Sequence, residues 1–242
     1  MKILLGICLA VSLVVAQPKG DQGTGEVVAG DPQVDGTLIH AAVFLKRMTI
    51  VRNGEEKPVG MLKQELTELP NGMLCTQTFD FQGQTSVDSA FFQHSTLVPR
   101  WHRSHNPKRI MKLDFQGRTV KGSYHPTGQP VEAINQLMEE PVFDSNILDL
   151  VIAALPLKQG YTAKVPFYVY EEGGLVWHNV TVEGEDVLRL SSGHTATCWK
   201  VLTANPKREI TFWIEKKTRE VFRSVVTLPN GEFRMERDEL VH

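Results

Sequence analysis

Apolar and polar residues alternate at every second position along much of the chain, in short runs separated by turn residues. Such a period of two is typical of β-strands with one buried face. The clearest run spans residues 161–170. Its odd-numbered positions share one face and are all apolar: Tyr161, Ala163, Val165, Phe167 and Val169.

Similar runs fill residues 44–124 and 175–235, and they predict about twelve strands. Residues 91–98 are included as a strand, and residues 175–182 and 186–190 are expected to be two separate strands. Residues 126–136 are expected to be a connector. Asn53-Gly54 predicts a tight hairpin between two strands. Short connections between consecutive strands imply antiparallel neighbours.

One segment departs from this pattern. Residues 141–157 carry apolar side chains around nearly the whole circumference of a helix, with a thin polar stripe of Asn146 and Asp149. Asp144 or Ser145 can cap the first turn, and Pro156 ends the helix. Because about ten helical residues reach only about 15 Å, the segment is too short to span a bilayer.

A short helix that is apolar almost all round must be enclosed by its own protein. The sequence therefore predicts a mainly β fold: a large curved antiparallel sheet, a half-barrel or open barrel, wrapped around one short central helix near residues 144–155. A flat sheet does not tolerate so many strands, so curling is expected.

Composition and the N-terminal sequence bear on the localisation of the protein but indicate little chemistry. The chain has 242 residues, 41% of them hydrophobic, and a formal charge of −2. This balance does not call for nucleic acid as a partner. Residues 1–16, with one cation followed by an apolar run, are typical of a signal peptide cut after Ala16. We expect residues 17–36 to be a flexible leader and residues 37–242 to form one β-rich domain without a transmembrane segment.

The mature chain keeps two cysteines, Cys75 and Cys198. In an oxidising compartment an even pair can form a disulfide. Both can equally be small buried apolar residues, as free cysteine often is. Spacing does not choose between these interpretations.

Several short motifs occupy strand and turn positions in both halves of the chain: Phe143-Asp144, Leu155-Pro156-Leu157, residues 182–187, Phe212-Trp213-Ile214-Glu215, Phe79-Asp80, residues 96–99 and residues 113–117. Together they resemble a bacterial secreted family called domain of unknown function 3108, over about residues 49–240. The resemblance implies an exported protein of the Gram-negative envelope, with a relation to the half-barrels that carry lipoproteins across the periplasm. It implies no catalytic residues.

Motifs of common hydrolases and nucleotide-binding proteins are absent from the sequence. His102 and His105 lie close together, but in a strand they would point to opposite faces, so no metal site is predicted. No catalytic residue and no cofactor is assigned either. Four cations form a basic patch that has two interpretations, an anionic partner or a solvated strand face: Arg100, Arg103, Lys108 and Arg109.

Three hypotheses for the function follow from these observations. The first is a non-enzymatic envelope protein that binds an apolar or amphipathic ligand, a lipid or lipoprotein segment, in the concave sheet. The second is an envelope scaffold or interaction module that binds another envelope protein through a sheet edge or the basic patch. The third, a hydrolase, has the least support.

Overall fold

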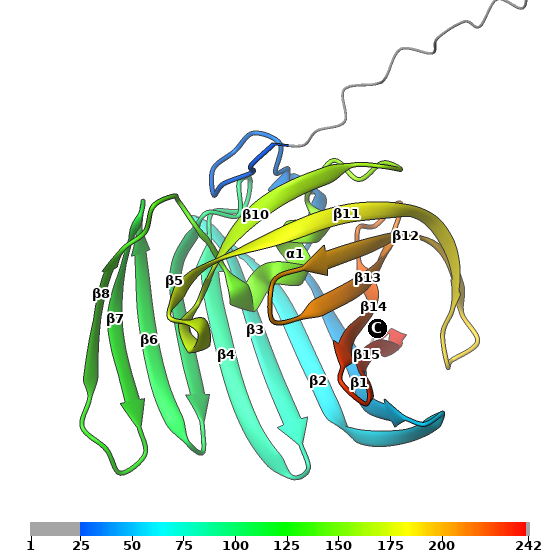
Figure 1. Ribbon diagram of the computed structural model, residues 1–242, viewed down its shortest axis with the longest axis horizontal. Helices are drawn as coiled ribbons and strands as arrows, with labels where there is room; N and C mark the ends of the chain where they lie inside the picture. The colour runs from blue at the N-terminus through cyan, green and yellow to red at the C-terminus, as the bar shows by residue number, and fades with distance from the viewer. Residues whose placement is uncertain (1–24, 241–242) are drawn as a thin grey trace, which may run out of the picture.

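A computed structural model describes residues 25–240 of the chain. The expected signal peptide, residues 1–16, lies outside the described residues. Fifteen strands form one continuous sheet, which curves around a single short α-helix (Figure 1). The prediction of a large curved sheet around one short helix is therefore confirmed.

The first half of the sheet contains the strands β1 (Ala42–Arg52), β2 (Glu55–Leu69), β3 (Gly72–Phe81), β4 (Gln84–Phe92), β5 (Pro99–Asn106), β6 (Arg109–Gln116), β7 (Thr119–Pro126) and β8 (Glu132–Leu137). The second half contains β9 (Phe143–Asp144), β10 (Thr162–Val169), β11 (Gly174–Arg189), β12 (Thr195–Ala204), β13 (Glu209–Glu215), β14 (Val221–Leu228) and β15 (Gly231–Leu240). Short helical segments are η1 (Gly36–Leu38), η2 (Ser145–Ile147), α1 (Leu148–Ala153) and η3 (Tyr170–Glu172).

From the centre of the sheet, β1 to β8 follow the chain outward on one side, and β15 to β9 run back along the chain on the other. It runs β8-β7-β6-β5-β4-β3-β2-β1-β15-β14-β13-β12-β11-β10-β9, so the first and last strands pair with each other. All neighbours are antiparallel except β9 and β10, which are parallel. Tight turns connect the two strands of each hairpin. At the predicted turn Asn53-Gly54 both residues have a positive φ, 52° and 81°, as such a hairpin requires.

The central helix is buried as its sequence indicates. Asp144 accepts a hydrogen bond from the backbone of Asn146 and so caps η2, which leads directly into α1. At the other end, the guanidinium of Arg219 donates to the carbonyl oxygens of Ala153 (3.4 Å) and Leu155 (3.3 Å). Most of the helix side chains belong to the largest hydrophobic cluster of the protein. No helix within residues 25–240 is long and apolar enough to cross a bilayer.

Side chains connect the β6–β8 end of the open sheet to η3, the short helical segment that follows β10. Tyr124 on β7 stacks on Tyr170 of η3 with ring centroids 4.7 Å apart. Arg109 on β6 forms an ion pair with Glu171 at 2.6 Å. These contacts bring the β6–β8 end over η3 and β10, while the backbone ladder stays open.

The expectation of a flexible leader over residues 17–36 is wrong for residues 25–36. Val27 and Val34 are almost fully buried in the main core. Val27 also donates from its backbone to the carbonyl of Lys164 at 2.8 Å, so the segment covers the free edge of β10. The two valines are the sequence feature that indicates packing against the core. Their segment is otherwise rich in glycine and acidic residues, a composition typical of a flexible leader.

Three strand boundaries also differ from the sequence prediction. Residues 93–98 form a turn after β4, with Leu97 at a φ of 52°. The expected connector 126–136 contains β8, an edge strand with little alternation. Finally, the two strands expected at 175–182 and 186–190 are one strand, β11, which continues through a bulge at Val182/Gly184.

Candidate functional site

A belt of polar side chains crosses the inner face of the sheet beside α1. On β1, β2, β3 and β14, residues two positions apart point to the same face. On each of these strands an apolar inward residue lies on the side of the hairpin turn, and the next inward residue toward the helix is polar. The pairs are Met48 and Lys46, Leu62 and Gln64, Phe79 and Gln77, and Val226 and Ser224.

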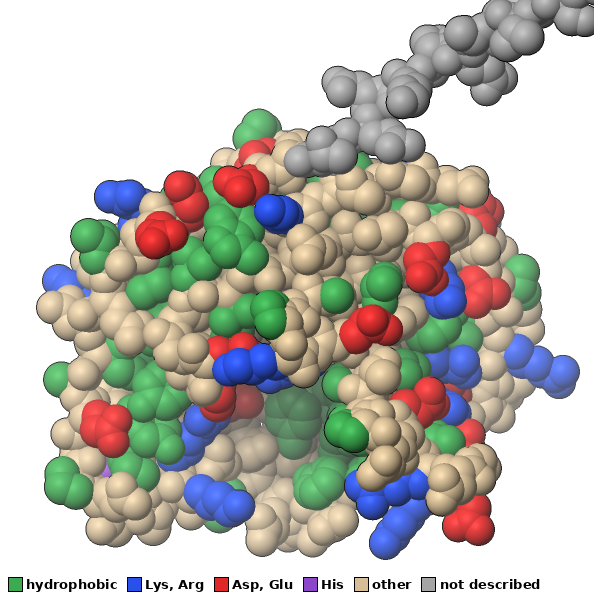
Figure 2. Space-filling view, viewed as in Figure 1, with side chains coloured by type: hydrophobic (Ala, Val, Ile, Leu, Met, Phe, Trp, Pro, Cys, Tyr) green, Lys and Arg blue, Asp and Glu red, His purple; other side chains and the backbone are tan. Residues whose placement is uncertain are grey.

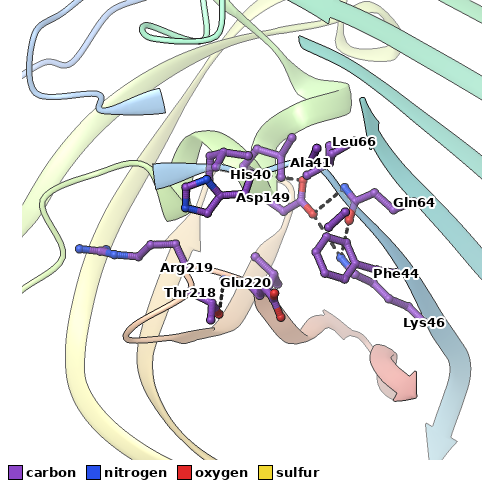
Figure 3. Close-up of a pocket in the computed structure, with 14 residues that line it drawn as sticks. His40, Ala41, Phe44, Lys46, Gln64, Leu66, Asp149, Thr218, Arg219 and Glu220 are labelled. Atoms are coloured by element: carbon purple, nitrogen blue, oxygen red, sulfur yellow. Dashed lines mark hydrogen bonds and ion pairs between the residues drawn. The ribbon is translucent and has the colours of Figure 1, made fainter. Parts of the chain in front are cut away.

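The centre of this polar belt is a triangle of three side chains (Figure 3). Lys46 is only 5% exposed, and its ammonium contacts Gln64 Oε1 at 2.8 Å and Asp149 Oδ2 at 3.3 Å. Gln64 also donates to the same Asp149 oxygen at 3.1 Å. Because an ammonium carries three donors, these contacts leave one N–H of Lys46 for another acceptor.

The helix supplies the remaining polar groups of the belt. Asp149 comes from α1, and the backbone carbonyl of Asn146 accepts a hydrogen bond from Gln77 at 3.1 Å. The polar stripe that the sequence predicts on the helix therefore faces the polar positions of β1–β3. A small cavity of about 80 Å³ lies on the far side of the triangle, toward His40 and Glu220 (Figure 3).

On the near side of the triangle lies a larger cavity of about 400 Å³, between the start of the helix and the sheet. Figure 2 shows a hollow on this face of the molecule, with apolar side chains inside it. Its apolar wall consists of Leu62, Phe79, Leu148, Val169, Ile210, Phe212, Val226 and Met235. Its polar wall includes Lys46, Gln77, Asn146, Asp149 and Ser224.

Every charged side chain that lines the cavity has a partner of opposite charge. Lys46 pairs with Asp149 in the belt. Nearer the outside, Arg208 pairs with Glu172 at 3.3 Å, and Glu171 pairs with Arg109. The cavity therefore offers no uncompensated charge to a ligand.

His178 also lines the cavity and is 2% exposed. The amide oxygen of Asn205 accepts from the backbone of Lys207 and Arg208, which directs the amide nitrogen toward His178 Nε2 at 3.0 Å. The imidazole must then accept at Nε2 and carry its proton on Nδ1. Burial, together with the nearby cation of Arg208, lowers the pKa of His178 to about 4, so the ring is neutral near pH 7.

The histidines considered as metal ligands do not lie together. His102 is buried and contacts Asp144 Oδ1 at 3.2 Å, whereas His105 is exposed on the opposite face of β5. Burial alone would lower the pKa of His102, but the Asp144 carboxylate outweighs it and raises the pKa. Within residues 25–240, no three His, Cys, Asp or Glu side chains are placed to hold a metal ion.

The basic patch is not one surface. Arg103 and Arg109 point to opposite faces of the sheet, because Arg103 is opposite Lys112 on the outer face and Arg109 follows the inward positions of β6. Arg103 pairs with Asp114 at 2.6 Å and Arg109 with Glu171. Arg100 and Lys108 are exposed. Two of the four cations are thus neutralised by neighbouring carboxylates.

The two cysteines are free and buried. Cys75 on β3 belongs to the main core, whereas Cys198 on β12 belongs to a separate cluster with Leu188 and Phe222. The disulfide considered from the sequence is not formed. Burial raises the pKa of both thiols, that of Cys198 to about 12.

Sequence reasoning missed the polar belt on the sheet. Lys46, Gln64 and Gln77 each occupy an inward position of a strand, and the sequence pattern alone assigns them no role. Their signal was a polar residue in phase with apolar neighbours two positions away on both sides. Only the antiparallel pairing places three such positions next to one another.

Comparison with known proteins gives a family and a fold. The sequence model of a family described as "Protein of unknown function (DUF3108)" matches residues 41–238. No curated protein matches the chain. Among solved structures, a crystal structure from Brucella abortus, described as a beta-barrel-like protein of domain of unknown function DUF1849, is similar with a TM-score of 0.57 and 11% identity. The match covers 84% of this chain and 98% of that chain, and it shows a shared fold.

Proposed function

The chain belongs to the DUF3108 family of unknown function, and we propose that it is an exported, non-enzymatic envelope protein that binds an amphipathic ligand between its helix and its curved sheet. The family and the barrel-like fold by themselves give no activity. The proposal rests on the cavity beside α1 and on the signal-like residues 1–16.

The observation that carries the binding proposal is that the helix does not fill the space enclosed by the sheet. A volume of about 400 Å³ remains, which falls within the range of small-molecule sites. Its lining combines an apolar wall with a few polar groups, the arrangement by which such sites bury a ligand and fix its orientation. A volume at the lower end of this range favours a single-chain ligand over a lipid with two acyl chains.

The binding proposal is tested by what the exported protein carries and what it takes up. Protein purified from the medium or periplasm is extracted with organic solvent, and the extract is examined by mass spectrometry. The extracted protein is then titrated with the neutral apolar fluorophore N-phenyl-1-naphthylamine. We expect a co-purifying amphipath that displaces the fluorophore. Clean protein that also takes up no fluorophore would contradict the proposal.

Two neighbouring valines on β14 offer a matched pair of variants. Val226 lines the cavity, whereas Val225 points to the other face of the sheet. Val226→Trp should fill part of the cavity and weaken fluorophore binding. Val225→Trp adds the same bulk outside and should leave the affinity unchanged. Equal effects of both variants would place the binding site elsewhere.

The non-enzymatic part of the proposal has its own test. The bound amphipath, recovered after prolonged incubation with excess protein, should have an unchanged mass. Turnover of the ligand would instead support the hydrolase hypothesis. Export is checked by N-terminal sequencing of the secreted protein, which should begin at Gln17.

A second function, binding of another envelope protein, has one specific observation in its favour. The edge strand β8 pairs only with β7 in the described sheet. Every second residue of β8 directs its backbone N–H and C=O groups away from β7. Leu137, at the end of the strand, is 71% exposed. An open edge can accept an extended segment of a partner. Cross-linking at Asn135 in cells, with Lys121 on the neighbouring strand as the control position, tests this alternative.

A further inference from the structure

The order of apolar and polar layers inside the cavity indicates which end of the ligand enters first. Near the hairpin turns, the inner face presents Met48, Phe79, Val226 and Met235. Two residues deeper on β1, β3 and β14 lie Lys46, Gln77 and Ser224, and beyond them the apolar core resumes on β1 and β3 at Phe44 and Cys75. Along these strands the polar layer therefore lies deeper in the cavity than the apolar layer, and the ion pairs of Arg208 with Glu172 and of Glu171 with Arg109 form the outer rim.

We propose that the cavity takes a neutral, single-chain amphipath with its polar end inward, against the polar belt, and its apolar chain at the mouth. This inference rests on the proposed binding function and specifies the ligand class and its orientation. A carrier of bare acyl chains would need the reverse order, because a methyl end placed against the polar belt would leave the remaining N–H of Lys46 dehydrated without an acceptor.

The polar belt provides donors for the inward end. Lys46 has one N–H beyond its contacts with Gln64 and Asp149. The Ser224 hydroxyl, on a side chain that is 5% exposed, also lines the cavity. Both can donate to an oxygen acceptor such as an alcohol, amide or ester. The polar end is thus a group with an accepting oxygen.

Charge compensation selects a neutral polar end. Lys46 already has Asp149 as its counter-ion at 3.3 Å, and the charged groups near the outside are paired as well. A carboxylate or ammonium on the ligand would add one uncompensated charge beside polar groups that are themselves almost fully buried. Such a charge is costly in a protein interior unless it gains its own partner.

The test uses three ligands with the same ten-carbon chain: decanol, decanoate and decylammonium. Each is titrated by calorimetry into the complete mature protein, from which endogenous lipid has been removed. We expect decanol to bind at least about tenfold more tightly than either ion, which corresponds to about 1.4 kcal/mol. Equal or tighter binding of an ion overturns the ligand class while leaving the binding function in place. Absence of binding by all three overturns both.

A variant isolates the contribution of the polar belt. Lys46→Met, Gln64→Leu and Asp149→Leu together make the centre of the belt apolar and should abolish the advantage of decanol over the ions. The matched control uses the ion pair on the outer face of β2, the strand that carries Gln64. Lys63 and Glu65, which are 3.0 Å apart, are replaced by Met and Leu. The control should keep the full preference.

Orientation is measured on the unmodified sequence, so it does not depend on the folding of a variant. With methyl-labelled methionine, the terminal methyl of bound decanol should give a nuclear Overhauser effect to Met235 at the mouth. The carbinol methylene should not. The opposite pattern, with the carbinol next to Met235, overturns the polar-end-inward orientation whatever the affinities are.

Discussion

Asp149→Leu provides the sharpest test of how dry the polar belt is. The change removes the counter-ion of Lys46, whose side chain is 6% exposed, while Gln64 remains at 2.8 Å. Loss of one partner of a buried ion pair costs about 3–5 kcal/mol, because the other charge stays buried without compensation. For a domain of this size, such a loss lowers Tm by roughly 6–20 °C.

Further substitutions should restore stability step by step. Adding Lys46→Met removes the uncompensated charge. Replacing a buried ion pair by apolar residues often leaves the free energy of unfolding unchanged. The amide of Gln64 would then lack both of its charged partners, a deficit of about 1–3 kcal/mol. Gln64→Leu should remove that deficit, so the triple variant should approach the original stability.

Urea denaturation of the mature protein measures each step, provided that the m-value stays constant. The control is Glu65→Leu, which breaks the exposed pair with Lys63 and should change the unfolding free energy by less than about 1 kcal/mol. If Asp149→Leu is no more costly than Glu65→Leu, Lys46 is well hydrated in the folded protein. The reasoning about a dry polar belt would then be refuted.

Three further predictions concern other parts of the molecule. The pKa of His178 falls from 6.5 to about 4 on folding, because the buried ring is held neutral. The fold therefore has its full stability above about pH 6.5. As the pH falls toward 4, about 3 kcal/mol of that stability is lost. Urea titrations at several pH values should show a shallower loss in His178→Gln, and an unchanged slope would contradict this assignment. Cys75 and Cys198 should resist maleimide in the folded protein and both react in urea; a mass showing a disulfide in the secreted protein would count against the free thiols. Gly36→Ala should lower Tm strongly, since the new Cβ would lie 1.8 Å from the carbonyl oxygen of His94. An unchanged Tm would show that the two backbone segments can separate at little cost.

The sequence was sufficient for the architecture because the fold depends on local patterns. Period-two runs marked most strands, and the helix was recognisable because residues 147–155 are apolar on nearly every side. The edge strand β8 escaped detection because an exposed edge needs little alternation. Residues 25–36 escaped because only Val27 and Val34 bury side chains among many glycines and acids.

The candidate site was only partly predictable, for a different reason. The polar stripe of Asn146 and Asp149 could be predicted from the helix, but its partners lie between 69 and 103 positions earlier in the chain. Lys46 and Asp149 are 103 positions apart, and neither the pattern of β1 nor that of the helix alone shows that the two side chains face each other. The pairing of β1 with both β2 and β15 decides this, and it depends on the closure of the whole sheet.

The position of the polar belt argues that folding alone does not account for it. An unbroken apolar inner face from Met48 to Phe44 would join the small cluster at the mouth to the main core. Filling the cavity with apolar side chains would then add about 25 cal/mol for each Å² removed from water. Instead, Lys46 and its partners separate the two apolar layers, and a space of about 400 Å³ remains beside the polar belt. A molecule that satisfies the polar layer with one end and the apolar mouth with the other would recover both contributions, which is the physical basis for proposing a polar-end-inward ligand.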